Sequence, residues 1–78
     1  MTAYDLYLRA YALFWSSARQ LPEALHLTEQ AIARDTRYGL AISWAAYCSL
    51  GLVHHGLSED WATDRQKAID FARRALEA

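Results

Sequence analysis

The sequence predicts an all-α protein of four antiparallel helices, arranged as two helix hairpins of a short α-solenoid. Residues 38–58 contain no Asp, Glu, Lys or Arg, whereas the segments on either side combine charged residues with apolar stripes of helical spacing. The chain has no run with the two-residue period of a strand and no hairpin-turn sequence. Short connections between helices favour antiparallel neighbours.

Residues 4–18 predict the first helix. Its apolar stripe has the spacing i, i+4, i+7, i+11 and i+14, and consists of Tyr4, Leu8, Tyr11, Trp15 and Ala18. Three further residues widen this stripe beyond one face: Tyr7, Leu13 and Phe14. We therefore expect this helix to pack on two sides, and we interpret its aromatic residues as core rather than as a ligand cage.

Residues 21–35 predict the second helix. Pro22 and Glu23 indicate its first turn. Proline is favoured there, and an acidic residue there interacts favourably with the positive end of the helix dipole. The face expected to point inward consists of Ala24, Leu27, Ala31 and Ile32. Residues 35–37 predict the turn that follows.

Residues 38–56 predict the third helix, which is apolar on nearly all sides. Such a helix either spans a membrane or is buried among other helices. Only sixteen uncharged residues precede the His54-His55 pair, which is short for a span, so we expect a buried central helix. Gly56 followed by Leu57 predicts a left-handed glycine cap. Gly51 inside the helix suggests a neighbouring helix that packs closely there.

The fourth helix has two possible starts in the sequence. Ser58 followed by two acidic residues provides one cap, and Thr63 with Gln66 has the spacing of a capping box. With either start, residues 64–76 are expected to be helical. The apolar stripe consists of Ala68, Phe71, Ala72, Ala75 and Leu76.

Length and charge limit the class of protein. The 78 residues are expected to form one domain, residues 1–78, and the net charge of −1 provides no basic patch for nucleic acid. No apolar signal segment begins the chain, and the single cysteine, Cys48, is expected to be a buried, inert thiol. We expect a cytoplasmic protein without membrane contact.

An internal repeat relates the two halves of the chain. Residues 24–32 and 68–76 share the pattern A-φ-x-φ-x-x-x-A-φ, where φ is apolar, and Tyr4 and Tyr38 are 34 positions apart. The two alanine patterns are 44 positions apart instead. Repeat one is therefore expected at about residues 4–37, and repeat two at about 38–78 with an insertion near 56–62.

These repeats resemble a known group of proteins. Residues 4–10, 29–35, 45–48 and 72–76, with the connection from Gly56 to Trp61, are similar to the tetratricopeptide region that follows the catalytic domain of bacterial adenylate/guanylate cyclases. Similar regions follow winged-helix DNA-binding domains in some regulators. The chain departs from the usual pattern at Thr36, Ile42, Ala46 and Ser49. The resemblance implies a helix-pair solenoid with a concave surface, and we expect a piece of a longer regulator.

Catalytic and metal-binding patterns are weak. His54 and His55 are adjacent on one helix and point about 100° apart, and neither they nor His26 have the i, i+4 spacing that a shared metal ion needs. The serines, including Ser43, have no His–Asp partner at a useful spacing. We expect no enzymatic activity, no cofactor and no metal site.

The expected functional feature is a groove on the first helix of each pair. Projecting the repeat register places seven residues there: Arg9, Leu13, Ser16, Ser43, Trp44, Tyr47 and Leu50. Trp44 and Tyr47 are suited to anchor a peptide, and Arg9 is suited to hold a carboxylate. The same residues could instead meet a third repeat or a second copy of the chain.

We therefore expect a non-enzymatic protein-protein interaction or sensory-regulatory module that belongs to a larger signalling or transcription regulator. The alternative is a structural spacer or dimerisation segment of a cyclase-type or winged-helix protein, and a metal- or cofactor-binding helical bundle is a distant third. A homodimer is expected through the first helix, with help from the fourth. The residues expected to pair are Tyr4, Tyr7, Tyr11, Phe14 and Trp15.

Overall fold

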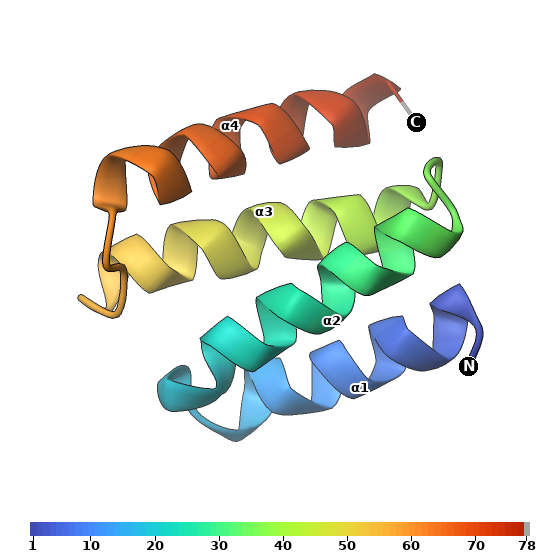
Figure 1. Cartoon of the computed structure of the whole chain (residues 1–78), viewed down its shortest axis with the longest axis horizontal. Helices are drawn as coiled ribbons and strands as arrows, with labels where there is room; N and C mark the ends of the chain where they lie inside the picture. Colours follow the sequence, from blue (N-terminus) through green and yellow to red (C-terminus); the bar gives the residue numbers. More distant parts are fainter. Residues whose placement is uncertain (78) are drawn as a thin grey trace.

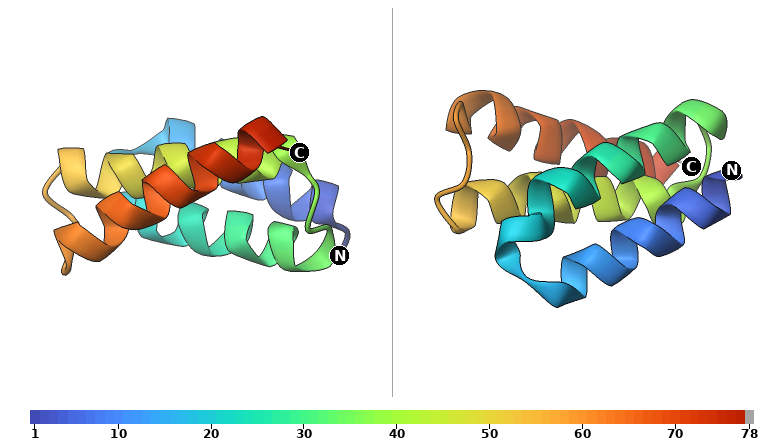
Figure 2. Two further views of the ribbon diagram at one scale, coloured as in Figure 1. Left: turned by 90° about the horizontal axis from the view of Figure 1, so that it is seen from above. Right: turned by 60° about the horizontal axis from the view of Figure 1, so that its bottom comes forward.

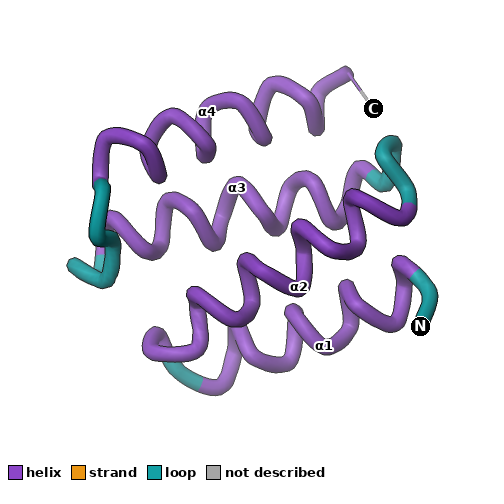
Figure 3. Tube along the Cα trace, viewed as in Figure 1, coloured by secondary structure: helices purple, strands orange, loops and turns teal. Residues whose placement is uncertain are grey.

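A computed structural model describes residues 1–77; the last residue of the predicted second repeat lies outside them. Over these residues the chain forms helices and no strands, which confirms the all-α prediction (Figure 3). The elements are α1 (Ala3–Ser16), the short 3₁₀ helix η1 (Ala18–Gln20), α2 (Leu21–Arg34), α3 (Gly39–His54) and α4 (Trp61–Glu77).

Consecutive helices run antiparallel, so that α1 and α3 point the same way (Figures 1 and 2). The helix α2 packs against both α1 and α3, and α4 packs against α3. The helices α1 and α4 lie at opposite edges (Figure 1). The molecule is a thin slab of 30 × 26 × 15 Å, and its core lies along the α1–α2 and α2–α3 contacts.

The ends of α1 are set by side-chain caps that the sequence analysis did not identify. Thr2 and Asp5 form a reciprocal capping box, in which each backbone N–H donates to the other side chain at 3.1 Å. The helix ends at Ser16, two residues before the predicted end. The Ser17 hydroxyl then accepts a hydrogen bond from the backbone N–H of Arg19 at 3.1 Å and caps η1.

The predicted core face of α1 is partly wrong. The stripe residues Tyr4, Leu8, Tyr11 and Trp15 are exposed, whereas Tyr7, which was predicted to widen the stripe, is buried together with Leu6 and Ala10. Both sides of this helix are apolar, so hydrophobic spacing alone could not choose between them. The choice depends on α2, which covers only one side.

The core face of α2 is largely as predicted. Ala24 and Ala31 are fully buried and Ile32 is buried, whereas Leu27 is only half-buried. Pro22 lies in the first turn, as expected. The helix also buries Leu21, Leu25 and Thr28. The Thr28 hydroxyl donates to the Leu25 carbonyl at 2.7 Å.

The helix α3 is central, as its lack of charge predicted, but it is buried on only part of its surface, because Leu40, Tyr47 and Leu50 are exposed. Its buried residues cover two adjacent sides and are Ala41, Ile42, Ala45, Cys48, Ser49 and Leu52. The C-terminus has the predicted glycine cap, since Gly56 has φ 69°. The N–H of Leu57 donates to the Leu52 carbonyl at 2.9 Å, and the N–H of Gly56 donates to the Val53 carbonyl at 3.2 Å, the two bonds of a Schellman motif.

The helix α4 begins at neither of the two predicted starts. Asp60 caps it: the backbone N–H and the hydroxyl of Thr63 donate to the two Asp60 carboxylate oxygens at 3.1 and 2.7 Å. The Ser58 hydroxyl donates to the Asp64 carboxylate at 2.5 Å, which joins the preceding loop to the first turn of α4. The predicted stripe is partly wrong. Ala68 is buried, but Leu76 is 89% exposed, because α4 is an edge helix that packs mainly on α3, with a Lys67–Glu29 ion pair of 3.6 Å to α2.

We expect Ala31→Leu to lower the free energy of unfolding by about 1–3 kcal/mol, because the larger side chain overpacks a fully buried position. Ala75, which the sequence pattern aligns with Ala31, is only half-buried, so Ala75→Leu should cost less. Ala33→Leu, on the exposed side of α2, is the control and should change stability by no more than about 0.5 kcal/mol. Urea denaturation measures all three. Equal midpoints for Ala31→Leu and Ala33→Leu would contradict the packing.

Ser49 has a buried hydroxyl oxygen with no hydrogen-bond partner among the described residues. Ser49→Ala should therefore raise the free energy of unfolding, because it removes a desolvated polar group without breaking a bond, an effect of about 1 kcal/mol. Ser43→Ala on the half-exposed side of α3 is the matched control for the higher helix propensity of alanine. The prediction fails if Ser49→Ala gains no more stability than Ser43→Ala in thermal or urea unfolding.

Candidate interaction surface

Aromatic rings fill the space between α1 and α3. The Trp44 ring of α3 lies at the centre, with ring centroids 4.5 Å from Phe14, 5.2 Å from Tyr11 and 6.3 Å from Trp15 of α1. All three pairs meet edge to face, the favourable geometry for aromatic quadrupoles, worth about 0.5–1.5 kcal/mol each beyond burial. These contacts hold two parallel helices whose backbones approach each other little.

The outer side of this cluster is exposed and apolar. Seven large side chains there are between 42% and 66% exposed: Tyr4, Leu8, Tyr11 and Trp15 of α1, and Leu40, Tyr47 and Leu50 of α3. We call these seven residues the aromatic face. On each helix they recur at intervals that keep them on one side. The contact of Trp44 with Tyr11 and Trp15 joins the two halves of the face.

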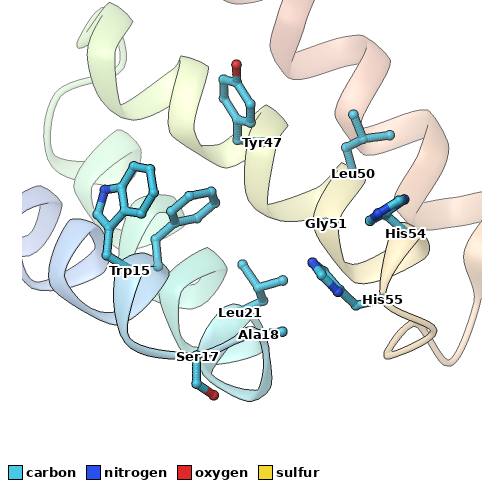
Figure 4. A pocket seen from close by; sticks show the side chains of 10 residues that line it. Trp15, Ser17, Ala18, Leu21, Tyr47, Leu50, Gly51, His54 and His55 are labelled. Carbon is cyan, nitrogen blue, oxygen red and sulfur yellow. The ribbon is translucent and has the colours of Figure 1, made fainter.

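A cleft of about 540 Å³ lies at one end of the aromatic face, where α1 ends, α2 begins and α3 ends (Figure 4). It is lined by Phe14, Trp15, Ser17, Ala18, Leu21, Tyr47, Leu50, Gly51, His54 and His55. At its base, a Cβ atom on Gly51 would lie 3.0 Å from Cδ1 of Leu21. This is the close helix approach that Gly51 suggested in the sequence.

The polar side-chain groups of the cleft lining are two imidazoles, the hydroxyls of Ser17 and Tyr47, and the indole N–H of Trp15. The rings of His54 and His55 are 5.0 Å apart and nearly perpendicular, and both line the cleft (Figure 4). The Ser17 hydroxyl already accepts the Arg19 N–H. The cleft lining contains no carboxylate, lysine or arginine. The histidines were considered in the sequence analysis only as possible metal ligands, because the residues opposite them in the cleft lie more than 30 positions earlier in the chain.

The structure brings together only part of the predicted groove. Trp44, Tyr47 and Leu50 lie on or beside the cleft, and Ser43 is one turn before Tyr47 on the same side of α3. The three predicted residues of α1 do not line the cleft. Leu13 packs on the core, Ser16 donates its hydroxyl to the Leu13 carbonyl at 2.9 Å, and Arg9 is exposed. Helical rotation of about 100° per residue places Arg9 about 160° away from Tyr11.

Of the residues expected to pair copies of the chain, Tyr4, Tyr11 and Trp15 are exposed on the aromatic face. Tyr7 is buried and Phe14 is half-buried, so they contribute to the core and to the cleft wall instead. The helix α4, which was expected to help, lies on the other side of α3 and away from α1 (Figure 1).

Titratable groups with shifted pKa values lie away from the cleft. Burial raises the pKa of the Cys48 thiol to about 12, and hydrogen bonds from Thr63 lower the pKa of the Asp60 carboxyl. Within residues 1–77, no three His, Cys, Asp or Glu side chains are grouped so that they could hold a metal ion. None of the helices that the structure describes is long and apolar enough to cross a membrane.

Comparison of the chain with protein-family models, with curated proteins and with solved structures finds no match in any of the three. The function is therefore argued from the geometry of the aromatic face and its cleft.

Cys48 should react slowly with a thiol-specific disulfide reagent. At pH 8 its raised pKa leaves about 10³-fold less thiolate than an ordinary cysteine has, and its side chain is 1% exposed. We expect a rate in native protein that is lower than in urea by a factor of about 100 or more, measured by absorbance. Because the fold favours the neutral thiol, stability is retained below its usual pKa of about 9 and decreases as pH rises above it. A native rate within about tenfold of the unfolded rate would contradict this.

Proposed function

We propose that this chain is a non-enzymatic, tetratricopeptide-like protein-protein interaction module that binds partners through its aromatic face and cleft. The observation that carries the proposal is the set of seven large apolar side chains exposed together on α1 and α3. Taking about 200 Å² for an aromatic side chain, these residues expose on the order of 700 Å². Monomeric proteins seldom expose a continuous apolar patch of more than a few hundred Å² without using it for binding.

The composition of the face supports a protein or peptide partner. Four of its seven members are Tyr or Trp, which are enriched in the centres of interfaces because they bury much area at a low entropic cost. The cleft of about 540 Å³ is large enough for a bulky apolar side chain of a bound segment. The imidazoles of His54 and His55 can supply hydrogen bonds at its edge.

The resemblance to tetratricopeptide regions supports the same function, since those regions bind partners on the surface formed by the first helix of each pair. In this chain α1 and α3 are the first helices of the two pairs, and they carry the aromatic face. We propose that the module belongs to a larger signalling or transcription regulator. The alternative, a spacer that dimerises a neighbouring domain, is favoured by the absence of charge on the face.

Panning a displayed library of random peptides, each about 12 residues long, tests the proposal. The chain is immobilised sparsely, so that two copies cannot meet, and selected peptides are compared on wild type and on Tyr47→Glu. We expect peptides rich in aromatic residues and leucine that lose about tenfold or more in affinity on Tyr47→Glu, because a charge is placed beside the cleft. Ala72→Glu, on the exposed side of α4, is the control and should bind as wild type does.

The proposal fails if no selected peptide distinguishes wild type from Tyr47→Glu. It also fails if Ala72→Glu weakens binding as much as Tyr47→Glu does, because the peptides would then recognise overall charge rather than the aromatic face.

A further inference from the structure

The aromatic face contains no charged residue, although 22% of the chain is charged. Asp5 and Arg9 are the charged residues of α1, and helical rotation places them about 90° and about 130° from the middle of the exposed stripe. The helix α3 has no Asp, Glu, Lys or Arg. A twofold interface brings the same surface of two copies together. A face without charge can form such an interface without like-charge repulsion.

The outward positions are also arranged symmetrically along each helix. On α1, Tyr4, Leu8, Tyr11 and Trp15 are separated by intervals of four, three and four residues. On α3, Leu40, Ser43, Tyr47 and Leu50 are separated by three, four and three. Each series is the same in both directions, so an antiparallel copy of each helix presents side chains at matching positions.

The two ends of the face differ in shape. Its C-terminal end holds the cleft, whereas Tyr4 and Leu40 are exposed at its N-terminal end. Because α1 and α3 run parallel, these two residues belong to the same end of the molecule (Figure 1). An antiparallel pairing therefore places the N-terminal end of each face over the cleft of the other.

We propose that the occupant of the aromatic face is a second copy of this chain, bound antiparallel about a twofold axis that crosses the middle of α1 and α3. This rests on the proposed function and names the partner of the same surface. In this dimer Tyr4 of one copy lies over Trp15 of the other, and Leu40 lies over Leu50. Each cleft receives apolar side chains from the opposite N-terminal end.

The exposed area is sufficient for such a dimer. The face exposes on the order of 700 Å² per copy, and stable protein interfaces bury about 800 Å² per partner. A parallel twofold pairing would bury a similar area, but it would place cleft over cleft and leave both unfilled. Shape at the two ends therefore selects the antiparallel arrangement.

Light scattering during size-exclusion chromatography gives the first measurement. The full chain at about 50 µM is expected to have twice its mass of 8.9 kDa. Leu40→Arg and Leu50→Glu should each shift the mass to that of the monomer, because each places an unpaired charge in the interface. Both positions are exposed in the single chain, and circular dichroism checks that the variants keep the helical fold.

A mixture of the two variants distinguishes the antiparallel pairing. In a mixed dimer the guanidinium introduced by Leu40→Arg in one chain faces the carboxylate introduced by Leu50→Glu in the other, and the second contact is the wild-type pair of leucines. An equimolar mixture should therefore recover the dimer mass. Ala62→Arg and Ala72→Glu place the same charges on exposed positions of α4 and should leave the wild-type mass unchanged.

A wild-type mass near 8.9 kDa overturns the proposal. If peptides are nevertheless selected by the aromatic face, the interaction function stands and the partner is a different protein. A dimer that neither variant disrupts shows that another surface pairs, which also overturns the proposal. A dimer that both variants disrupt but their mixture does not restore overturns the antiparallel arrangement.

Discussion

The fold depends on a central helix without formal charges that accepts neighbours on two sides. The helix α3 buries small residues at Ala41, Ala45 and Ser49, so that α2 and α4 can both pack closely on it. At Gly51 a Cβ atom would lie only 3.0 Å from Cδ1 of Leu21, so any larger residue there would require the Leu21 side chain to move. A charge on either side would have to be desolvated at a cost of several kcal/mol, which explains why the charged residues lie on the other helices and the loops.

The third side of α3 uses large residues instead of small ones, and this difference produces the candidate site. Where α3 faces α1, the rings of Trp44 and Phe14 lie between the helices, 4.5 Å apart. Rings of this size keep the two backbones apart, whereas the small residues of the other sides let the backbones approach. The separation leaves a cleft where the ring cluster ends, beyond Trp15 and Tyr47. The size of the residues on each side of α3 thus determines whether its neighbour packs closely, as α2 and α4 do, or leaves a cleft, as α1 does.

The features that could be predicted from the sequence are those that depend on one helix alone. The central position of α3, the left-handed cap at Gly56 and the first-turn Pro22 follow from local composition and backbone geometry, although one side of α3 is exposed. The core face of α1 could not be predicted, because both of its sides are apolar and the choice depends on which side α2 covers. The histidines of the cleft were missed for a related reason: their neighbours are distant in sequence. Leu76 was misplaced because the edge helix α4 is covered on one side only, and Leu76 lies on the uncovered side.

Stability and association are coupled in a molecule built this way. The helix α1 packs on α2 and touches α3 mainly through rings, so its outer side contributes nothing to folding while it faces water. A small core supplies only about 3–5 kcal/mol of net stability. Any partner that covers the aromatic face binds the folded chain and not the unfolded one, and so adds RT ln(1 + [L]/Kd) to that stability. If the partner is a second copy, protein concentration itself determines how firmly α1 is held. The exposed apolar residues on the outer side of α1, which add nothing to its stability in the single chain, would then stabilise it in the dimer.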